Sequence, residues 1–209
     1  MRVTLLSHTK DPEKVVYEAC RISRGSSSPM ETLIPKVLSK GHFSVLEHVS
    51  FTFLIEDISR VCSHQLVRHR IASYTQESQR CVRVKDFILP KSLEENEKVR
   101  LGLNAVATIY EKLLQEVKEE DARYIMPQAS STRILMTMNG RSLLNFFWER
   151  CCFRAQDEIR ELAWRILEIM KTKFPLLFDY EFVGPKCFWF LGCPEGYEDC
   201  PYYWKWHQP

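Results

Sequence analysis

The chain has 209 residues, and 45% of them are hydrophobic, so it is long enough for one domain with a sizeable core. Its formal net charge of only +2, with charged residues at 27%, argues against a protein that binds nucleic acid over its whole surface. The start of the chain has only the short apolar stretch from Val3 to Leu6, so we expect no signal peptide. The apolar runs fall short of the ~18 residues of a membrane span, so we expect no membrane segment and a cytoplasmic location.

The first quarter of the chain predicts a strand, two helices and a second strand. Residues 2–7 read as a short strand, and Asp11 followed by Pro12 begins a helix, since Asp is a favoured N-cap and Pro suits the first helical position. A second amphipathic helix ends at Gly41, a residue type that commonly closes helices. Apolar and polar side chains then alternate through residues 49–56, which is typical of a half-buried strand.

A third helix is expected next, capped by either Asp57 or Ser59. Its expected apolar residues are Ile58, Val61, Cys62 and Leu66. Gln65 lies about one turn before Arg68, so both side chains can face one ligand.

The second half of the chain predicts a long helix, a strand and further helices. Ser92–Glu95 has the composition of a capping box and opens the long helix. The apolar stripe of that helix, which we expect to be core, consists of Leu103, Val106, Tyr110, Leu113 and Val117. A loop at 127–131 leads into a strand at 132–138, and Gly140 starts a helix. Helical spacing continues through residues 159–167. The apolar residues expected to be buried in these last two helices are Leu143, Leu144, Phe146, Phe147, Ile159, Leu162, Ala163, Ile166 and Leu167.

Cationic and hydroxyl side chains are concentrated in one segment, RHRIASYTQESQR, from Arg68 to Arg80. Arg68 and Arg70 offer planar guanidinium groups that can bind phosphate or carboxylate through two hydrogen bonds, and His69 stands between them. Further donors follow at Ser73, Ser78 and Arg80. We expect this segment, folded around one turn, to bind phosphate and a polar ring. A solvated helix face or a general anion patch is the alternative.

A second polar string surrounds the start of the helix at Gly140, and it consists of Asn139, Arg141, Asn145 and Arg150. Arg141 and Asn145 share a helix face, whereas Arg150 lies nine positions past Arg141 and so about 180° round the helix. Either the helix breaks near residues 151–153, or its two faces serve two pockets, which requires packing against another copy of the chain. Surface-charge placement explains any one of these residues alone.

The spacing of both strings resembles that of the flavin-dependent thymidylate synthases. In the first string, Arg-His-Arg is followed by Ser after two residues, Ser after four more, and Arg after one more. In the second, Asn-x-Arg is followed by Asn after three residues and Arg after four more. The family's Gly-His with Glu five residues later matches His42 and Glu47, with Ser44 at the small hydroxyl position. The similarity covers residues 1–180, so we expect one domain there and treat 181–209 as an aromatic, Cys-rich tail that is not an independent domain.

The resemblance implies an α+β fold, a single domain with long helices around a small, mostly antiparallel sheet. It also implies a homotetramer in which FAD sits at subunit contacts and each active site draws on several chains. The implied reaction is the reductive methylation of dUMP to dTMP in nucleotide biosynthesis. The one-carbon donor is 5,10-methylenetetrahydrofolate, and NADPH is the reductant through FAD.

The resemblance also assigns roles to individual residues. The implied FAD contacts are Ser44, Arg68, His69, Arg70, Gln76, Asn139, Arg141 and Asn145. The implied dUMP contacts are Gln65, Arg68, Gln76, Ser78, Arg80, Arg123 and Arg150. Arg150 is the candidate catalytic residue, because a guanidinium against the uracil ring can stabilise negative charge that develops there. Arg80 and Arg123 suit the phosphate, and Ser78 is expected to bind rather than to attack, since no base and orienting group are legible around it.

Three positions differ from many family members, which have Glu at Gln76, Tyr at Cys81 and His at Arg154. Gln76 keeps a carbonyl oxygen but loses charge, and Arg154 replaces a titratable ring with a fixed cation. We therefore expect altered surroundings of the flavin, with Arg154 behind the residues that touch it.

The chain past Pro175 is expected to be irregular and aromatic. Its notable residues are Cys187, Cys193 and Cys200, the tryptophans Trp189, Trp204 and Trp206, and His207. The cysteine spacings match neither a zinc knuckle nor a redox pair, so we expect reduced structural thiols and no metal, with zinc as the alternative. The aromatic residues are expected to cover a hydrophobic flank of this chain or its neighbour.

Two other functions compete with the enzyme. A nucleotide or RNA binding module would keep the phosphate grip, show steep salt dependence and contain no flavin. A flavoprotein with oxidase activity only would consume NADPH yet make no dTMP. Flavin content and dTMP formation therefore separate the three hypotheses.

Overall fold

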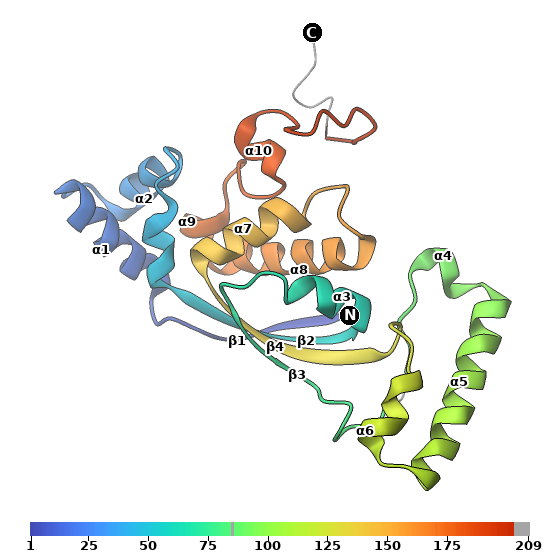
Figure 1. Cartoon of the computed structure of the whole chain (residues 1–209). Helices are drawn as coiled ribbons and strands as arrows, with labels where there is room; N and C mark the ends of the chain where they lie inside the picture. Colours follow the sequence, from blue (N-terminus) through green and yellow to red (C-terminus); the bar gives the residue numbers. More distant parts are fainter. Residues whose placement is uncertain (85, 203–209) are drawn as a thin grey trace.

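A four-stranded antiparallel sheet is the centre of the fold (Figure 1). The computed structural model describes residues 1–84 and 86–202. The strands are β1 (Arg2–His8), β2 (Ser50–Ser59), β3 (Ser73–Gln76) and β4 (Ser131–Asn139), in the order β1-β2-β4-β3. The expected α+β class with a small antiparallel sheet is confirmed, as are the predicted strands at 2–7, 49–56 and 132–138. β3 is absent from the sequence prediction.

The two middle strands give the sheet one apolar face and one mixed face. Their register places Phe53 beside Met136 and Ile55 beside Ile134, and all four side chains are buried. Because side chains alternate along a strand, the residues next to these four point to the other face. There Thr52 Oγ1 and Thr137 Oγ1 are hydrogen bonded at 2.9 Å and stay partly exposed.

Two helices cover the apolar face, α7 (Gly140–Arg150) and α8 (Asp157–Lys173) (Figure 1). All nine of their predicted apolar positions are buried, so the helical period was read correctly. Because α7 follows β4 directly, the end of the strand fixes where the second polar string begins.

A short helix, α3 (Arg60–Leu66), follows β2 without a loop and ends just before the first polar string. Of the two predicted caps, Ser59 is the one used, since its Oγ accepts a hydrogen bond from the Cys62 N–H at 3.1 Å. The Glu158 carboxylate on α8 accepts two more, from the Ser59 N–H at 2.7 Å and the Ser59 hydroxyl at 2.5 Å. The start of α3 is therefore fixed to α8.

Two predicted apolar positions of this helix are wrong. Ile58 is buried but belongs to β2, and Val61 is 38% exposed, because only one side of so short a helix faces the core. Asp57, the other candidate cap, has a φ of 57° where the pairing of β2 with β4 is irregular.

The N-terminal helices lie at one end of the sheet (Figure 1). They are α1 (Pro12–Arg24), α2 (Met30–Leu38) and the 3-10 helix η1 (Phe43–His48). α1 starts as predicted, with Asp11 at the N-cap position, although the Asp11 side chain makes no capping hydrogen bond. Gly41, with a φ of 77°, closes the turn that follows α2.

Residues 91–125 form a helical arm that extends away from the sheet at the opposite end from α1 (Figure 1). The arm contains α4 (Lys91–Glu94), α5 (Glu97–Glu116), α6 (Glu119–Ala122) and the 3-10 helix η2 (Arg123–Ile125). The predicted capping box at Ser92 is wrong: α4 is a separate short helix, and the N-cap of the long helix is Asn96, whose Oδ1 accepts from the Val99 N–H at 3.2 Å.

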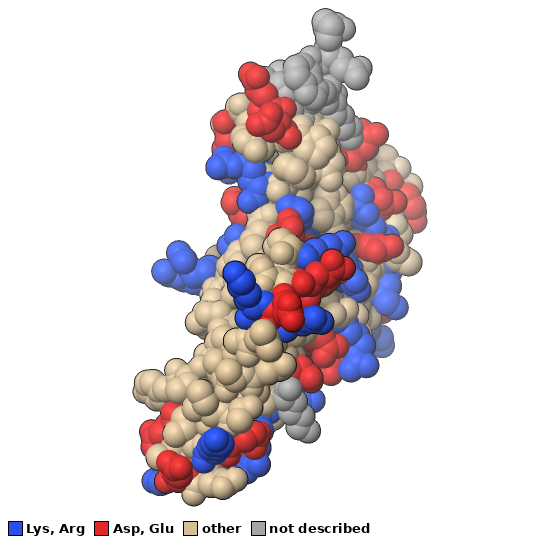
Figure 2. All heavy atoms as spheres, turned by 90° about the vertical axis from the view of Figure 1, so that its right-hand side faces the viewer, with Lys and Arg blue, Asp and Glu red and all other residues tan. Residues whose placement is uncertain are grey.

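The expectation that the α5 stripe is core is also wrong for a single chain. Of its five residues only Tyr110 is buried, and Val117 is 43% exposed. Other apolar residues of α5 are exposed as well, Leu101 to 62% and Ile109 to 51%. Figure 2 shows a broad uncharged surface on the lower part of the molecule, where the arm lies, with charged side chains gathered at its end.

The C-terminal part contains two short helices, α9 (Pro175–Phe178) and α10 (Lys186–Phe190), within an otherwise irregular chain. All eight cysteines are free. The predicted tail residues Trp204, Trp206 and His207 lie outside the described residues. Across 1–84 and 86–202, no helix combines the length and apolar character that crossing a membrane requires.

Candidate active site

Helix α7 presents its two arginines to two different places. The guanidinium of Arg141, in the first turn, lies over the rings of Phe43 and Trp148, with Cζ 5.0 and 5.8 Å from the ring centroids. Arg150, the last residue, donates from Nε to Nε2 of His69 at 3.0 Å. The helix is unbroken between the two arginines and the chain turns only after Arg150. Residues 151–155 form a turn before α8 begins, so the alternative of a helix that breaks near residues 151–153 agrees with the structure. The other alternative, two pockets completed by another copy of the chain, stays a prediction.

His69 joins the first polar string to the end of α7. Its ring meets Phe146 edge to face, with centroids 5.0 Å apart. Burial, together with the neighbouring Arg150 cation, lowers the pKa of His69 from 6.5 to about 4. The imidazole is therefore neutral at pH 7, and its Nε2 lone pair accepts the Arg150 hydrogen bond. This bond fixes the orientation of the guanidinium.

We expect His69 to make stability depend on pH. Because its pKa is lower in the folded state, the unfolded chain binds the proton more readily, and the free energy of unfolding should fall as pH drops from 6.5 towards about 4. Urea titrations at several pH values, followed by circular dichroism, measure this. His69→Gln should flatten the dependence, and the matched change at exposed His64, His64→Gln, should not. Equal slopes in all three proteins would refute the assignment.

The start of α7 is capped by a side chain and lies close to η1. Asn139 caps it, since its Oδ1 accepts from the Ser142 N–H at 2.7 Å. A Cβ at Gly140 would lie 2.9 Å from the Leu46 carbonyl oxygen, so only glycine permits this close approach to η1. Arg141 then stands beside a helix N-terminus, where the dipole favours negative charge. A cation and a positive helix end side by side both favour an anionic ligand.

The outer arginines of the first string are exposed. Arg68 and Arg70 follow the end of α3, and within the described part of the chain neither forms an ion pair. The backbone beneath them is held, because the Tyr74 hydroxyl is hydrogen bonded to the carbonyls of Leu66 at 3.0 Å and His69 at 2.9 Å. Two unpaired guanidinium groups on a fixed turn suit an anionic ligand.

The expectation that this string folds around one turn is wrong. β3 lies inside it, so Arg68 and Arg70 precede the strand and Ser78 and Arg80 follow it. An edge strand of four residues with polar neighbours leaves little periodicity to detect.

The predicted phosphate residues gather near the helical arm. Arg80 Nη2 lies 3.2 Å from Glu120 Oε2, and Arg123 Nε donates to the Glu120 carbonyl at 3.1 Å. The Ser78 Oγ accepts from the Arg80 N–H at 3.2 Å. A cavity of about 460 Å³ lies here, lined by Ser78, Arg80, Cys81, Lys118, Glu119 and Glu120. Sequence reasoning missed Lys118, because it precedes an acidic run and belongs to neither polar string.

The two predicted glutamines are partly engaged within the chain. Gln65 Nε2 donates to Gln156 Oε1 at 3.4 Å. Gln76 Nε2 donates to Ser63 Oγ at 2.8 Å and to Thr132 Oγ1 at 3.2 Å, which leaves the Gln76 carbonyl oxygen for a ligand.

Two further predicted flavin residues lie towards the η1 end of the molecule. Ser44 is exposed on η1 and lines an open hollow with Glu47. Asn145 is half-buried on α7, one turn after Arg141.

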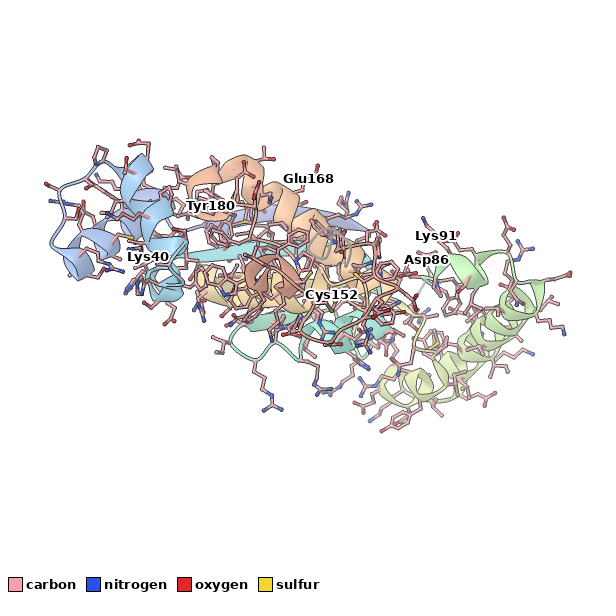
Figure 3. The ribbon with its side chains drawn as sticks, turned by 90° about the horizontal axis from the view of Figure 1, so that it is seen from above. Lys40, Asp86, Lys91, Cys152, Glu168 and Tyr180 are labelled. Atoms are coloured by element: carbon pink, nitrogen blue, oxygen red, sulfur yellow. The ribbon has the colours of Figure 1, made fainter. Side chains whose placement is uncertain are left out.

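A cavity of about 380 Å³ lies at the C-terminal end of α7, where the tail folds over it. Arg150 and Arg154 line it together with four thiols, Cys152, Cys187, Cys193 and Cys200. Figure 3 places Cys152 over the middle of the body. Burial, and then the thiols of Cys200, Cys152 and Cys193, raise the pKa of Cys187 to about 11. Among the residues that the structure describes, no three His, Cys, Asp or Glu side chains are arranged to hold a metal ion.

One protomer does not bring all the predicted nucleotide residues together. The cavity lined by Arg80 and the cavity lined by Arg150 share no residue. Arg80 forms an ion pair with Glu120 of the arm, whereas Arg150 is hydrogen bonded to His69, which follows α3.

Comparison with known proteins gives consistent matches over most of the chain. Residues 4–176 match the family described as thymidylate synthase complementing protein. A flavin-dependent thymidylate synthase of Geobacter sulfurreducens is 44% identical, over 96% of this chain and 94% of its own. That of Pyrococcus furiosus is 42% identical, over 93% of this chain and 90% of its own. The crystal structure of thymidylate synthase X from Helicobacter pylori with FAD and dUMP is similar at a TM-score of 0.75 and 26% identity, covering 86% of this chain and 98% of that one.

Proposed function

The chain belongs to the flavin-dependent thymidylate synthase family, and on this premise we propose that it converts dUMP to dTMP with 5,10-methylenetetrahydrofolate as one-carbon donor and NADPH as reductant. One contact supports this most. Arg150 and His69 stand 81 residues apart in the sequence, yet they are joined at 3.0 Å. This contact joins the two polar strings, and we assign both to one active site.

The residues present fit FAD. A pyrophosphate calls for cations and backbone N–H groups, and unpaired Arg68 and Arg70 together with Arg141 at the start of α7 offer both. We also assign to the flavin Ser44, His69, Gln76, Asn139 and Asn145. When bound, FAD supplies the hydride chemistry that side chains lack.

We assign the dUMP phosphate to Ser78, Arg80 and Arg123. The Glu120 carboxylate already lies 3.2 Å from the Arg80 guanidinium, so an anion can occupy this position, and a phosphate dianion would compete for it. Gln65, Arg68 and Gln76 are assigned to the rest of the nucleotide.

Arg150 is assigned to the uracil ring. Its guanidinium stabilises the negative charge that develops on the ring when the fifth carbon becomes nucleophilic. The Nε–H is already donated to His69, so the two terminal nitrogens stay free for the ring. A neutral His69 suits this role, because a protonated imidazole could not accept that bond and would repel the cation.

We further propose that the chain acts as a cytoplasmic homotetramer whose active sites are shared between copies. Two observations support sharing: the cavities of Arg80 and Arg150 are separate, and α5 exposes Leu101 and Ile109 on its surface. A second copy packed on the arm would cover these apolar residues and could bring one copy's Arg80 to the other's Arg150.

Mixing two inactive variants tests the shared site. Arg80→Ala and Arg150→Ala should each be inactive alone, while unfolding and refolding them together should restore about a quarter of wild-type activity, since random assembly makes about one site in four intact. Each variant refolded with itself is the control. No recovery from mixtures shown by light scattering to be tetramers would mean that one chain supplies both residues.

Flavin content tests the function itself. The purified protein should be yellow, or become so with FAD, and NADPH should bleach its absorbance under anaerobic conditions. A colourless protein that FAD cannot reconstitute, and that binds RNA with steep salt dependence, would favour the nucleic-acid binding module instead.

A further inference from the structure

Four aromatic rings pack together between η1, the last turn of α7 and the tail. Phe43 meets Trp148 edge to face at 5.6 Å between centroids, and Trp189 meets Phe43 in the same way at 4.9 Å. The ring centroid of Trp189 lies 5.3 Å from that of Phe182 and 6.3 Å from that of Trp148. We call Phe43, Trp148, Phe182 and Trp189 the aromatic cluster.

The cluster supports the guanidinium of Arg141. Phe43 and Trp148 are the two rings beneath this cation, and Trp189 contacts both of them. The faces of aromatic rings attract cations, and a fixed ring holds the cation better than a mobile one. Trp189 therefore backs the two rings on which Arg141 rests.

Trp189 also lies against the turn that leads into η1. A Cβ at Gly41 would stand 3.2 Å from Cζ2 of the Trp189 ring, closer than most side-chain contacts. Ser44 lies three residues after Gly41, so the indole ring packs against the turn just before the helix that carries Ser44. Trp189 lies past the last residue, 176, that matches the family, and it belongs to the tail.

We propose that Trp189 is a positioning residue of the flavin site: by fixing Phe43 and Trp148 it holds Arg141 ready for the FAD pyrophosphate. This inference rests on the proposed function, in which Arg141 contacts FAD. The tail then has a role in cofactor retention. The sequence alone predicted only that its aromatic residues cover a hydrophobic flank. The tail acts through the arginine and does not touch the ligand.

The first test measures FAD affinity by fluorescence titration of the apoprotein. Trp189→Ala should weaken binding about tenfold, while kcat at saturating FAD stays near wild type. Trp189→Phe, which keeps a ring, should remain within about twofold of wild type. Phe190→Ala is the matched control, because Phe190 is the next residue, is 56% exposed and lies outside the cluster. Unchanged FAD affinity in Trp189→Ala would overturn the inference.

A double-mutant cycle separates this inference from the proposed function. If Trp189 acts through Arg141, adding Trp189→Ala to Arg141→Ala should weaken FAD binding no further. The same tenfold loss in both backgrounds would show that Trp189 acts by another route, and it would overturn the inference while leaving the flavin site intact. Failure of the wild-type protein to bind FAD at all would instead remove the proposed function. Trp189→Phe provides the test again if Trp189→Ala fails to fold, since an affinity equal to that of Arg141→Ala would also contradict the proposal.

Discussion

Replacing Arg150 with alanine should lower the rate of dTMP formation about a thousandfold at saturating dUMP, while the protein keeps its flavin. The reason is the separation of roles along α7. Arg150 lies at the helix end and is oriented by His69 at 3.0 Å, whereas the cations assigned to the FAD pyrophosphate lie elsewhere. Chromatographic measurement of dTMP under anaerobic conditions, with the FAD absorbance recorded on the same sample, provides both readings.

Arg150→Lys is the informative control. Lysine keeps the charge but has no Nε–H for His69 and no planar fork, so it should recover only a small part of the rate. If Arg150→Ala instead lost its flavin and made dTMP normally once FAD was added, the roles of the two arginines of α7 would be reversed.

Arg141→Ala should weaken FAD binding about thirty- to a hundredfold, because a charged hydrogen-bond donor at a helix N-terminus is lost. The dTMP rate should recover when FAD is saturating, since no reacting atom is assigned to Arg141. Equilibrium dialysis or fluorescence titration measures the affinity. Asn145→Ala, one turn further along the same face, gives a smaller expected loss, and equal affinity in wild type and Arg141→Ala would contradict the assignment of Arg141 to the flavin.

The parts of the fold with a strong local period could be predicted from the sequence. The strands around Phe53 and Met136 alternate over many residues, and α7 and α8 repeat apolar residues at helical spacing. The α5 stripe has the same period, yet only Tyr110 is buried in the single chain. A stripe predicts that some surface will cover it, and it does not say whether that surface belongs to the same chain.

The missed caps and strand have a local cause. Ser92 and Asn96 are both good N-cap residues a few positions apart, and it is Asn96 whose side chain accepts the capping hydrogen bond, from the Val99 N–H. β3 is four residues long and lies inside a polar string, so its period is too short to notice.

The sequence predicts the two polar strings of the candidate site, but not the contacts that bring them together. Spacing along the chain placed Arg141 and Arg150 on different faces of a helix, and this is confirmed. No spacing rule could pair His69 with Arg150, or place Trp189 beneath Phe43 and Trp148, because these contacts form only when distant segments pack.

Anaerobic dTMP formation, with each component omitted in turn, tests the account most directly. Complete mixtures of the flavin-free apoprotein with FAD, NADPH, dUMP and methylenetetrahydrofolate should make dTMP, and mixtures that lack any one of them should make none. Production of dTMP without FAD, or consumption of NADPH with no dTMP in the complete mixture, would contradict the account.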